Sequence, residues 1–482
     1  MKNIDKYEAV IGLEVHAQLL TKTKAYSSEE NTFGANPNTK TSTITLGHPG
    51  TLPKSNKKVI EHAVRIGIAV GANIRERNEY ARKNYFYADL PKGYQITQDK
   101  TPICEGGHIY IKDKDGNEKG IRLTRIHMEE DAGKSIHDLD PQNTLIDLNR
   151  AGVPLIEIVS EPELKTSTEA YLYINEVRRL VRYLDICDGN MEEGSLRCDA
   201  NISVMLKGST TFGKKVEVKN MNSARNVKRA IEFEVTRQVE RLEKGLEITQ
   251  ETRSFDARNG STISMRSKES ANDYRYFPEP DLQPIIINES YIQKIKKTFP
   301  LLPRQLFSKF TKKFNLSEYD ASILIEDKSI ALYFNELCKY TNHYKIAANY
   351  INGCIKSYLN EKAEKIENLN VSFEQLAELI MLVKKGKISS SVATQKIFPL
   401  LLKNEDSPSQ IAIQNNWIQE SNTDAITNYI KIVTEKYPNK VKEYREGKKG
   451  LIGFFMGEVM KLSQGKVDPK LANKLLEEQL EK

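Results

Sequence analysis

The segment VIGLEVHAQL (residues 10–19) alternates apolar and polar side chains, with Leu13 and Val15 on either side of Glu14 and His16 following. Because successive residues of a β-strand point to opposite faces, this pattern predicts a strand with one face in a hydrophobic core. Residues i and i+2 share a face, so Glu14 and His16 either converge on one small ligand or both face water.

The whole chain has 482 residues, a length that predicts two to four domains. Its hydrophobic content of 39% and charged content of 28% are typical of a soluble globular protein. No apolar run approaches the ~20 residues that span a bilayer, and the N-terminal sequence MKNIDKYEAV lacks the apolar stretch of a signal peptide. We therefore expect a cytoplasmic protein without a membrane segment.

The five cysteines are far apart in the sequence and form no C-x-x-C pair. The sequence therefore indicates neither a disulfide framework nor a cysteine zinc site, and we expect buried, unpaired thiols. The formal net charge of +7 permits a polyanionic partner without requiring one, because scattered lysines give the same total.

The first part of the chain is rich in alternating segments, and the rest is rich in amphipathic helices. Two helices are expected in the first part, one beginning at the capping box Thr166–Glu169 and one over residues 223–245. Strands outnumber these helices and are not regularly interleaved with them, which favours an α+β fold with a largely antiparallel sheet. Prolines near residue 280 mark a boundary. The predicted domains are residues 1–292, 293–405 and 406–482.

The stretch GSTTFGKK (residues 208–215) matches the spacing of a phosphate-binding loop. Such a loop needs Ser or Thr after the lysine and a helix that begins beside it. Here a second lysine follows, and KVEVKN has the pattern of a strand. We therefore predict a hairpin turn, and any nucleotide must bind elsewhere.

Two other segments carry acidic residues on polar strand faces. MEEGSLRCDANIS (residues 191–203) has Asp199 opposite an apolar face, and RIHMEEDAGKS (residues 125–135) has Glu129 and Glu130 beside a histidine. Carboxylates with one imidazole suit magnesium or manganese, because hard cations prefer oxygen ligands. For each strand taken alone, a face exposed to solvent is the alternative.

Six motifs resemble, in order, those of the B subunit of the bacterial tRNA-dependent amidotransferases, the GatB family. They are VIGLEVHAQL, RKNYFYADLPKGYQI, HMEEDAGKS, DLNRAGVPLIEIVSEP, MEEGSLRCDANIS and NDYRYFPEPDL. The resemblance covers the whole chain, most densely residues 8–282. It implies a cradle-shaped catalytic domain, an all-α helical domain and a helical tail.

The resemblance also implies a reaction. Members of this family bind tRNA misacylated with glutamate or aspartate and phosphorylate the side-chain carboxylate with ATP and Mg²⁺, after which ammonia displaces phosphate. An amidase A subunit supplies the ammonia, and a small C subunit completes a heterotrimer. No Ser-Ser-Lys amidase apparatus is apparent in this sequence, so we expect the ammonia to come from the partner.

Site residues follow from the matching motifs. The implied metal ligands are Glu14, His16, Glu130 and Asp199. Further catalytic candidates, which support the ligands or line the ammonia path, are Glu129, Glu157 and Glu192. Arg197 is a candidate for contacting the acylated end of tRNA, and Lys83 and Arg275 are candidates for binding the phosphates of ATP.

One departure from the family concerns zinc. Many members carry a four-cysteine zinc site near the N-terminus, whereas the matching positions here are Ser27, Glu29, Ser42 and Thr45. Because no thiolate remains, we expect no structural zinc.

The helical part carries two basic patches. Residues 294–314 contain seven basic side chains and no acidic one, and residues 440–449 contain five basic side chains. Such patches suit the phosphate backbone of tRNA, although a solvated helix face explains either one equally well. Two other functions stay open, a non-catalytic RNA-binding scaffold and a metal-dependent nuclease or phosphatase.

Overall fold

The computed structural model of the chain describes residues 4–113, 115–137, 139–267, 274–403, 406–419, 423–463 and 466–481. The chain divides into two compact units, Met1–Leu302 and Pro303–Lys482. The first unit ends beyond the predicted boundary at residue 292 because Ile295 joins its hydrophobic core and Leu302 packs against that core. The predicted division of the second unit near residue 405 stays a prediction.

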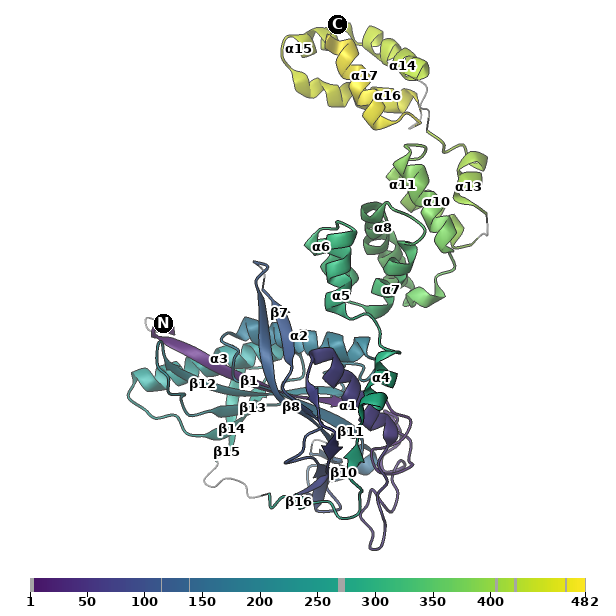
Figure 1. Cartoon of the computed structure of the whole chain (residues 1–482). Helices are drawn as coiled ribbons and strands as arrows, with labels where there is room; N and C mark the ends of the chain where they lie inside the picture. The colour runs from purple at the N-terminus through teal and green to yellow at the C-terminus, as the bar shows by residue number, and fades with distance from the viewer. Residues whose placement is uncertain are drawn as a thin grey trace. The chain divides into compact units, whose positions relative to one another are not determined.

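A ten-stranded sheet forms the centre of the first unit, and all but one of its strand pairs are antiparallel (Figure 1). Its strands, in spatial order, are β15 (Ser261–Ser267), β14 (Glu251–Asp256), β13 (Val216–Lys219), β12 (Leu196–Leu206), β1 (Tyr7–Gln18), β11 (Pro154–Ser160), β8 (Glu118–Glu130), β6 (Cys104–Glu105) and β2 (Asn73–Ile74), with β7 (His108–Lys112) paired to β8. The exception is the parallel pair β13–β14.

The hydrophobic core lies on one face of this sheet. Leu13 and Val15 of β1 are fully buried there, together with residues of helices α1 (Lys57–Val70), α2 (Ser167–Tyr183) and α3 (Ala224–Glu243). Figure 1 shows α2 and α3 running along the sheet. The alternation in residues 10–19 therefore predicted both the strand and its buried face correctly.

Local signals place the helix starts as predicted. Thr166 caps α2 by accepting a hydrogen bond from the Glu169 amide at 3.0 Å, and Ser223 caps α3 through the Asn226 amide at 3.1 Å. The Glu169 side chain does not bond the Thr166 amide; it accepts hydrogen bonds from the preceding Lys165 amide at 2.6 Å and from the Lys119 ammonium. Half of the predicted capping box is thus formed.

Residues 208–215 lie in the connection between the antiparallel strands β12 and β13. No helix follows the lysines, because β13 begins at Val216. The predicted hairpin turn is confirmed.

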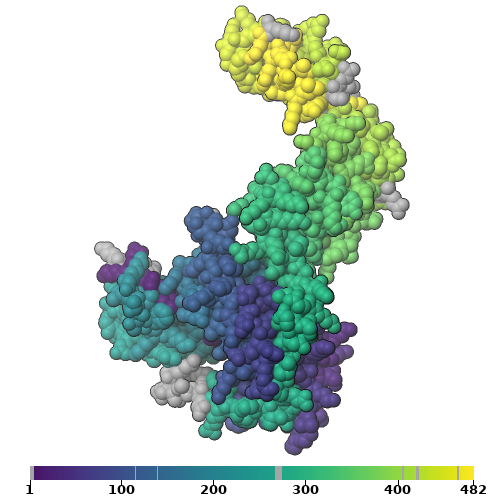
Figure 2. All heavy atoms as spheres, in the orientation of Figure 1, coloured from purple at the N-terminus to yellow at the C-terminus, as the bar shows by residue number. Residues whose placement is uncertain are grey.

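Smaller sheets and one further helix complete the first unit. The short strand pairs involve β3 (Arg77–Asn78), β4 (Ala81–Asn84), β5 (Tyr94–Thr97), β9 (Lys134–Ile136), β10 (Leu145–Asp147), β16 (Phe277–Pro278) and β17 (Ile285–Ile286). Helix α4 (Glu289–Lys296) contacts α1, and in Figure 2 this late segment lies against the early part of the chain. The guanidinium of Arg65 on α1 lies 5.6 Å from the Phe299 ring centroid.

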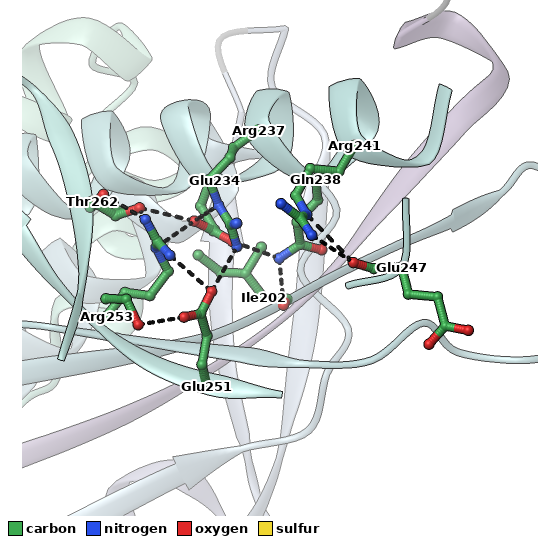
Figure 3. A network of polar contacts seen from close by, with 10 residues as sticks. Ile202, Glu234, Arg237, Gln238, Arg241, Glu247, Glu251, Arg253 and Thr262 are labelled. Atoms are coloured by element: carbon green, nitrogen blue, oxygen red, sulfur yellow. Dashed lines mark hydrogen bonds and ion pairs between the residues drawn. The ribbon is translucent and has the colours of Figure 1, made fainter. Parts of the chain in front are cut away.

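A network of polar contacts joins α3 to the edge strand β15 and its neighbour β14 (Figure 3). The carboxylate of Glu234 is fully buried and accepts hydrogen bonds from Arg237 at 2.7 Å, from Gln238 at 2.9 Å and from the Thr262 hydroxyl at 3.0 Å. Arg253 of β14 lies 3.6 Å from the same carboxylate. Glu234 therefore compensates two partly buried guanidinium groups at once.

The second unit is helical throughout its described residues. Its α-helices are α5 (Pro303–Ser308), α6 (Glu318–Leu324), α7 (Lys328–Leu337), α8 (Tyr344–Tyr350), α9 (Lys356–Lys362), α10 (Phe373–Lys384), α11 (Ser390–Val392), α12 (Phe398–Leu401), α13 (Pro408–Gln414), α14 (Thr423–Lys436), α15 (Pro438–Arg445), α16 (Ile452–Leu462) and α17 (Pro469–Glu481). Helices α14 to α17 share a hydrophobic core of their own. The predicted fold class, α+β followed by an all-α region, is confirmed.

Within the described part of the chain, no helix combines the length and the apolar character that a membrane span requires.

We predict that Glu234→Ala lowers the free energy of unfolding of the first unit by about 2 kcal/mol, because Arg237 and Arg253 then keep only Glu251 as an acidic partner and the buried Gln238 amide loses an acceptor. The exposed Glu232, on the same helix, provides the matched control, and Glu232→Ala should change this energy by less than about 0.5 kcal/mol. Urea unfolding, with hydrogen exchange of the β14 and β15 amides, measures both. Equal effects of the two substitutions would contradict the assigned role of Glu234.

Candidate functional site

The face of the sheet opposite the helices carries a concentration of ionisable side chains, and we call it the open face. Glu14 of β1 lies opposite Asp199 of β12, while His16 lies opposite Glu157 of β11. His127 of β8 lies opposite Glu157 in turn. Directly opposed residues of antiparallel strands point to the same face, so the strand register alone gathers these side chains.

The first cluster, which we call the His16 group, consists of His16, Glu129 and Glu157. The Nε2 atom of His16 lies 3.4 Å from a Glu129 oxygen and 3.8 Å from a Glu157 oxygen. His127 lies beside it, with its Nε2 3.0 Å from Glu157. One ligand atom from each member of the group lies within 4.8 Å of the others, a spacing that can hold a metal ion.

Charge interactions couple this group. Burial alone would lower the pKa of His16, but the negative charges of Glu157 and Glu129 outweigh burial and raise this pKa above its ordinary value of 6.5. Burial would likewise raise the pKa of Glu157, yet His16, His127 and Lys83 hold it well below the ordinary 4.5. The open face thus keeps Glu157 ionised as a ready ligand for a cation.

The second cluster, the Glu14 group, consists of Glu14, Asp199 and Glu217, whose ligand atoms also lie within 4.8 Å of one another. Burial, together with the charges of Glu157, Asp199 and Glu217, raises the pKa of Glu14. Burial is the larger cause, and the neighbouring carboxylates add an excess of negative charge. A divalent cation would relieve that excess.

Neighbouring side chains orient the Glu14 group. Asn201 donates a hydrogen bond to Glu14 at 2.8 Å, and Thr252 of β14 donates one to Glu217 at 2.8 Å. The ammonium of Lys219 lies 3.0 Å from Glu217 and also pairs with Asp199. These contacts fix three carboxylates that repulsion would otherwise separate.

The structure does not bring Glu130, the fourth ligand implied by resemblance, to either group. Glu130 follows Glu129 on β8, and consecutive strand residues point to opposite faces. Its carboxylate pairs with Lys92 and accepts a hydrogen bond from the Ile96 amide at 2.9 Å. On the open face, Glu129 occupies the place that was predicted for Glu130.

A cavity of about 570 Å³ adjoins both groups, with His16, Asp199 and Lys219 among its lining residues. Arg197 and Glu192 line it as well. The Arg197 guanidinium pairs with the nearly buried Asp131 at 3.0 Å, which holds it beside the cavity, whereas Glu192 is exposed. Arg197 and Glu192, two further predicted site residues, thus line the same cavity as the candidate metal ligands.

Lys83 lies on β4 of the three-stranded sheet β16-β4-β5, and Arg275 lies in the segment just before β16. The ammonium of Lys83 lies 4.7 Å from the ring centroid of Tyr274. Burial would lower its pKa, but neighbouring tyrosines and acidic residues, Glu129 among them, raise it instead. The Arg275 carbonyl accepts a hydrogen bond from Asn84 at 2.8 Å, and its side chain is exposed. Lys83 therefore acts electrostatically on the His16 group, and Arg275 lies on the surface nearby.

Comparison with known proteins decides the family. Residues 9–293 match the GatB/GatE catalytic domain, and residues 332–480 match the GatB domain. The chain belongs to the GatB family. It is 48% identical to the B subunit of the aspartyl/glutamyl-tRNA(Asn/Gln) amidotransferase of Thermodesulfovibrio yellowstonii, an alignment that covers 98% of both chains. The proteins of the same name from Persephonella marina and Geobacter sulfurreducens are each 46% identical, over 98% of this chain and 100% and 99% of theirs.

Membership of the GatB family confirms the resemblance found in the sequence motifs. Amidotransferases of this name are ligases that form carbon–nitrogen bonds with glutamine as the amide donor, and GatB is one component of such a complex. The predicted enzyme class is therefore confirmed at the level of the family.

The four positions matched to the zinc cysteines of other GatB proteins lie close together. Thr45 donates a hydrogen bond to Glu29 at 2.5 Å, and its hydroxyl lies 3.3 Å from that of Ser27. Ser42 accepts a hydrogen bond from the Thr45 amide at 3.4 Å. Burial would raise the pKa of Glu29, but hydrogen bonds from these hydroxyls lower it. Hydrogen bonding thus joins the two loop segments that carry these residues.

Sequence reasoning missed Glu217, Lys219 and Thr252, and it gave His127 no role. The signal for Glu217 and Lys219 was present, because Val216 and Val218 alternate with them in KVEVKN. Thr252 had no such signal, since its place beside Glu217 depends on the parallel pairing of β13 with β14.

We predict that Glu157→Gln lowers the pKa of His16, because burial then outweighs the remaining negative charge. In the unsubstituted, metal-free chain, protonation of His16 stabilises the fold below pH 6.5, and this stabilisation is lost as the pH rises through the raised folded-state pKa. Histidine NMR titration, with His16→Gln for assignment, measures the shift. As a control, Glu163→Gln removes a charge that pairs with Arg122 and should leave His16 unchanged. An unchanged pKa in Glu157→Gln would contradict the coupling.

Proposed function

We propose that this chain activates the side-chain carboxylate of glutamate or aspartate carried on tRNA. In the proposed reaction a carboxylate oxygen attacks the terminal phosphorus of ATP, giving an acyl phosphate and ADP. Ammonia then attacks the acyl carbon, and the carbon–oxygen bond to phosphate breaks to leave the amide and inorganic phosphate. The relatives, which are named as B subunits of the aspartyl/glutamyl-tRNA(Asn/Gln) amidotransferase, support this reaction class.

One observation carries the proposal more than any other: two sets of carboxylate ligands share the open face and adjoin one cavity. Their donors are carboxylate oxygens and one imidazole, a set that fits magnesium. The closeness of Glu14, Asp199 and Glu217 supports the fit, because three neighbouring carboxylates carry negative charge that a cation would neutralise. Mg²⁺ bound there would supply charge neutralisation and orientation to a transferring phosphoryl group.

The residues of the chain contribute binding and orientation. His16, Glu129 and Glu157 form one proposed ligand set, and Glu14, Asp199 and Glu217 form the other. The cation of Lys83 faces the first set and favours an anionic nucleotide there. The proposed contact of Arg197 with the acylated end of tRNA is supported by its ion pair with Asp131 and its place at the cavity, which Glu192 also lines. Arg275 is a candidate for the outer phosphates of ATP.

The proposed assembly is a heterotrimer with an amidase A subunit, which releases ammonia, and a small C subunit. We propose that the basic side chains of residues 294–314 and 440–449 contact the tRNA backbone. Lys442 and Lys448 in the second patch are largely exposed, which suits salt-dependent binding of phosphates. The name of the relatives, which includes tRNA, supports this partner.

We predict two metal sites that can be separated by substitution. Mn²⁺ binding to the full chain, followed by electron paramagnetic resonance, should show two sites. His16→Ala should remove one site and Asp199→Asn the other, because each substitution removes a ligand from only one group. Glu232→Gln, on the helix side of the sheet, should bind as the unsubstituted chain does. Unchanged binding in either ligand variant would contradict the assignment of that group.

We predict that Asp199→Asn and Glu157→Gln each lower aminoacyl-tRNA-dependent ATP hydrolysis by the reconstituted heterotrimer about 100-fold or more, through lost stabilisation of the phosphoryl group. The assay uses Glu-tRNA and Asp-tRNA in parallel, with Glu232→Gln as the control. Activity that survives both substitutions would favour a non-catalytic scaffold. Phosphate release or RNA cleavage with uncharged tRNA would favour a phosphatase or nuclease.

A further inference from the structure

Arg125 of β8 lies on the open face in the same row as the Glu14 group. It is opposite Val159 of β11, and Val159 is opposite Glu14 of β1, which is opposite Asp199. Arg125 is therefore two strands, or about 10 Å along the sheet, from the backbone of Glu14. No sequence motif had given this arginine a role.

A β-bulge turns Arg125 onto this face. Leu123 and Ile126 both belong to the hydrophobic core, although strict alternation would place them on opposite faces. The register with β11 shifts by one residue beside Val159. After Leu123 the alternation of side chains is therefore reversed, so that Arg125 points to the open face and Ile126 to the core. Bulges of this kind are common next to active sites, where they re-aim a side chain.

Among the described residues, the Arg125 guanidinium has no hydrogen-bond or ion-pair partner, and its Nε is buried without one. The nearest cross-strand acid, Glu105, is already paired with Arg75. By contrast, Arg122 on the same strand pairs with Glu163 at 2.5 Å. Burying part of an arginine without an acceptor costs free energy, so the position favours an anion that binds from outside the chain.

We propose that Arg125 is a catalytic residue that binds the non-bridging oxygens of the phosphoryl group transferred on the open face; this inference rests on the proposed function. The guanidinium is planar and presents paired N–H donors that match phosphate geometry. The two ligand groups contribute five carboxylates, which repel a phosphate unless cations intervene. An unpartnered arginine in the same row of side chains as the Glu14 group supplies positive charge to the oxygens of the phosphoryl group, where negative charge is spread during its transfer.

The experiment compares Arg125→Gln and Arg125→Lys with Arg122→Gln, which removes a guanidinium from the same strand. In the assembled complex, Arg125→Gln should lower aminoacyl-tRNA-dependent ATP hydrolysis about 100-fold, with Arg125→Lys in between and Arg122→Gln unchanged. Equilibrium binding gives a readout besides activity. Affinity for ADP with aluminium fluoride, a mimic of the transferring phosphoryl group, should fall about tenfold or more in Arg125→Gln, while affinity for ADP and for tRNA stays the same.

The outcomes separate the two proposals. If the unsubstituted complex hydrolyses ATP and Arg125→Gln does so at the same rate with the same affinity for the mimic, the inference is wrong and the proposed function stands. If Arg125→Gln weakens tRNA binding and leaves the mimic unaffected, the arginine binds a tRNA phosphate and the inference is wrong. If the unsubstituted complex shows no aminoacyl-tRNA-dependent hydrolysis, both proposals fail. Loss of a partnerless guanidinium should not lower the melting temperature.

Discussion

The register of β1 between β11 and β12 is the constraint on which the rest of the site depends. Leu13 and Val15 are fully buried, and each such side chain contributes about 1.5–3 kcal/mol by leaving water. A slip of one residue would move them to the open face and put Glu14 and His16 into the core. Hydrophobic burial on one face therefore positions the charged groups on the other, with a precision that the charged groups could not achieve themselves.

Like charges crowd the open face, and the surrounding residues limit the cost. Burial and the charges of Glu157, Asp199 and Glu217 together raise the pKa of Glu14. Lys219 offsets part of the charge in one group, while His16 and His127 offset it in the other. The compensation is incomplete, so cations that bind on the open face would stabilise the folded state.

The sequence allowed β1 and β12 to be assigned because alternation is a local signal, and Glu14, His16 and Asp199 follow from it directly. The sequence could not decide whether Glu129 or Glu130 faces His16. That depends on which alternate residues of β8 point to the open face, and only the pairing of β8 with β11 determines it. A bulge beside Arg125 reverses that alternation along the strand, and nothing in the sequence marks it. The fold class could be predicted from the alternation of apolar and polar residues alone. The members of the site could not, because they depend on the register between strands.

The position of Arg125 also depends on strand register. Its lack of a partner is not a property of its own segment, because it results from Arg75 binding Glu105 at the far edge of the sheet. All members of both ligand groups come from five strands of that one sheet, and α14 to α17 have a separate core. Strand pairing within the first unit therefore positions both candidate ligand groups, without any residue of the helical unit.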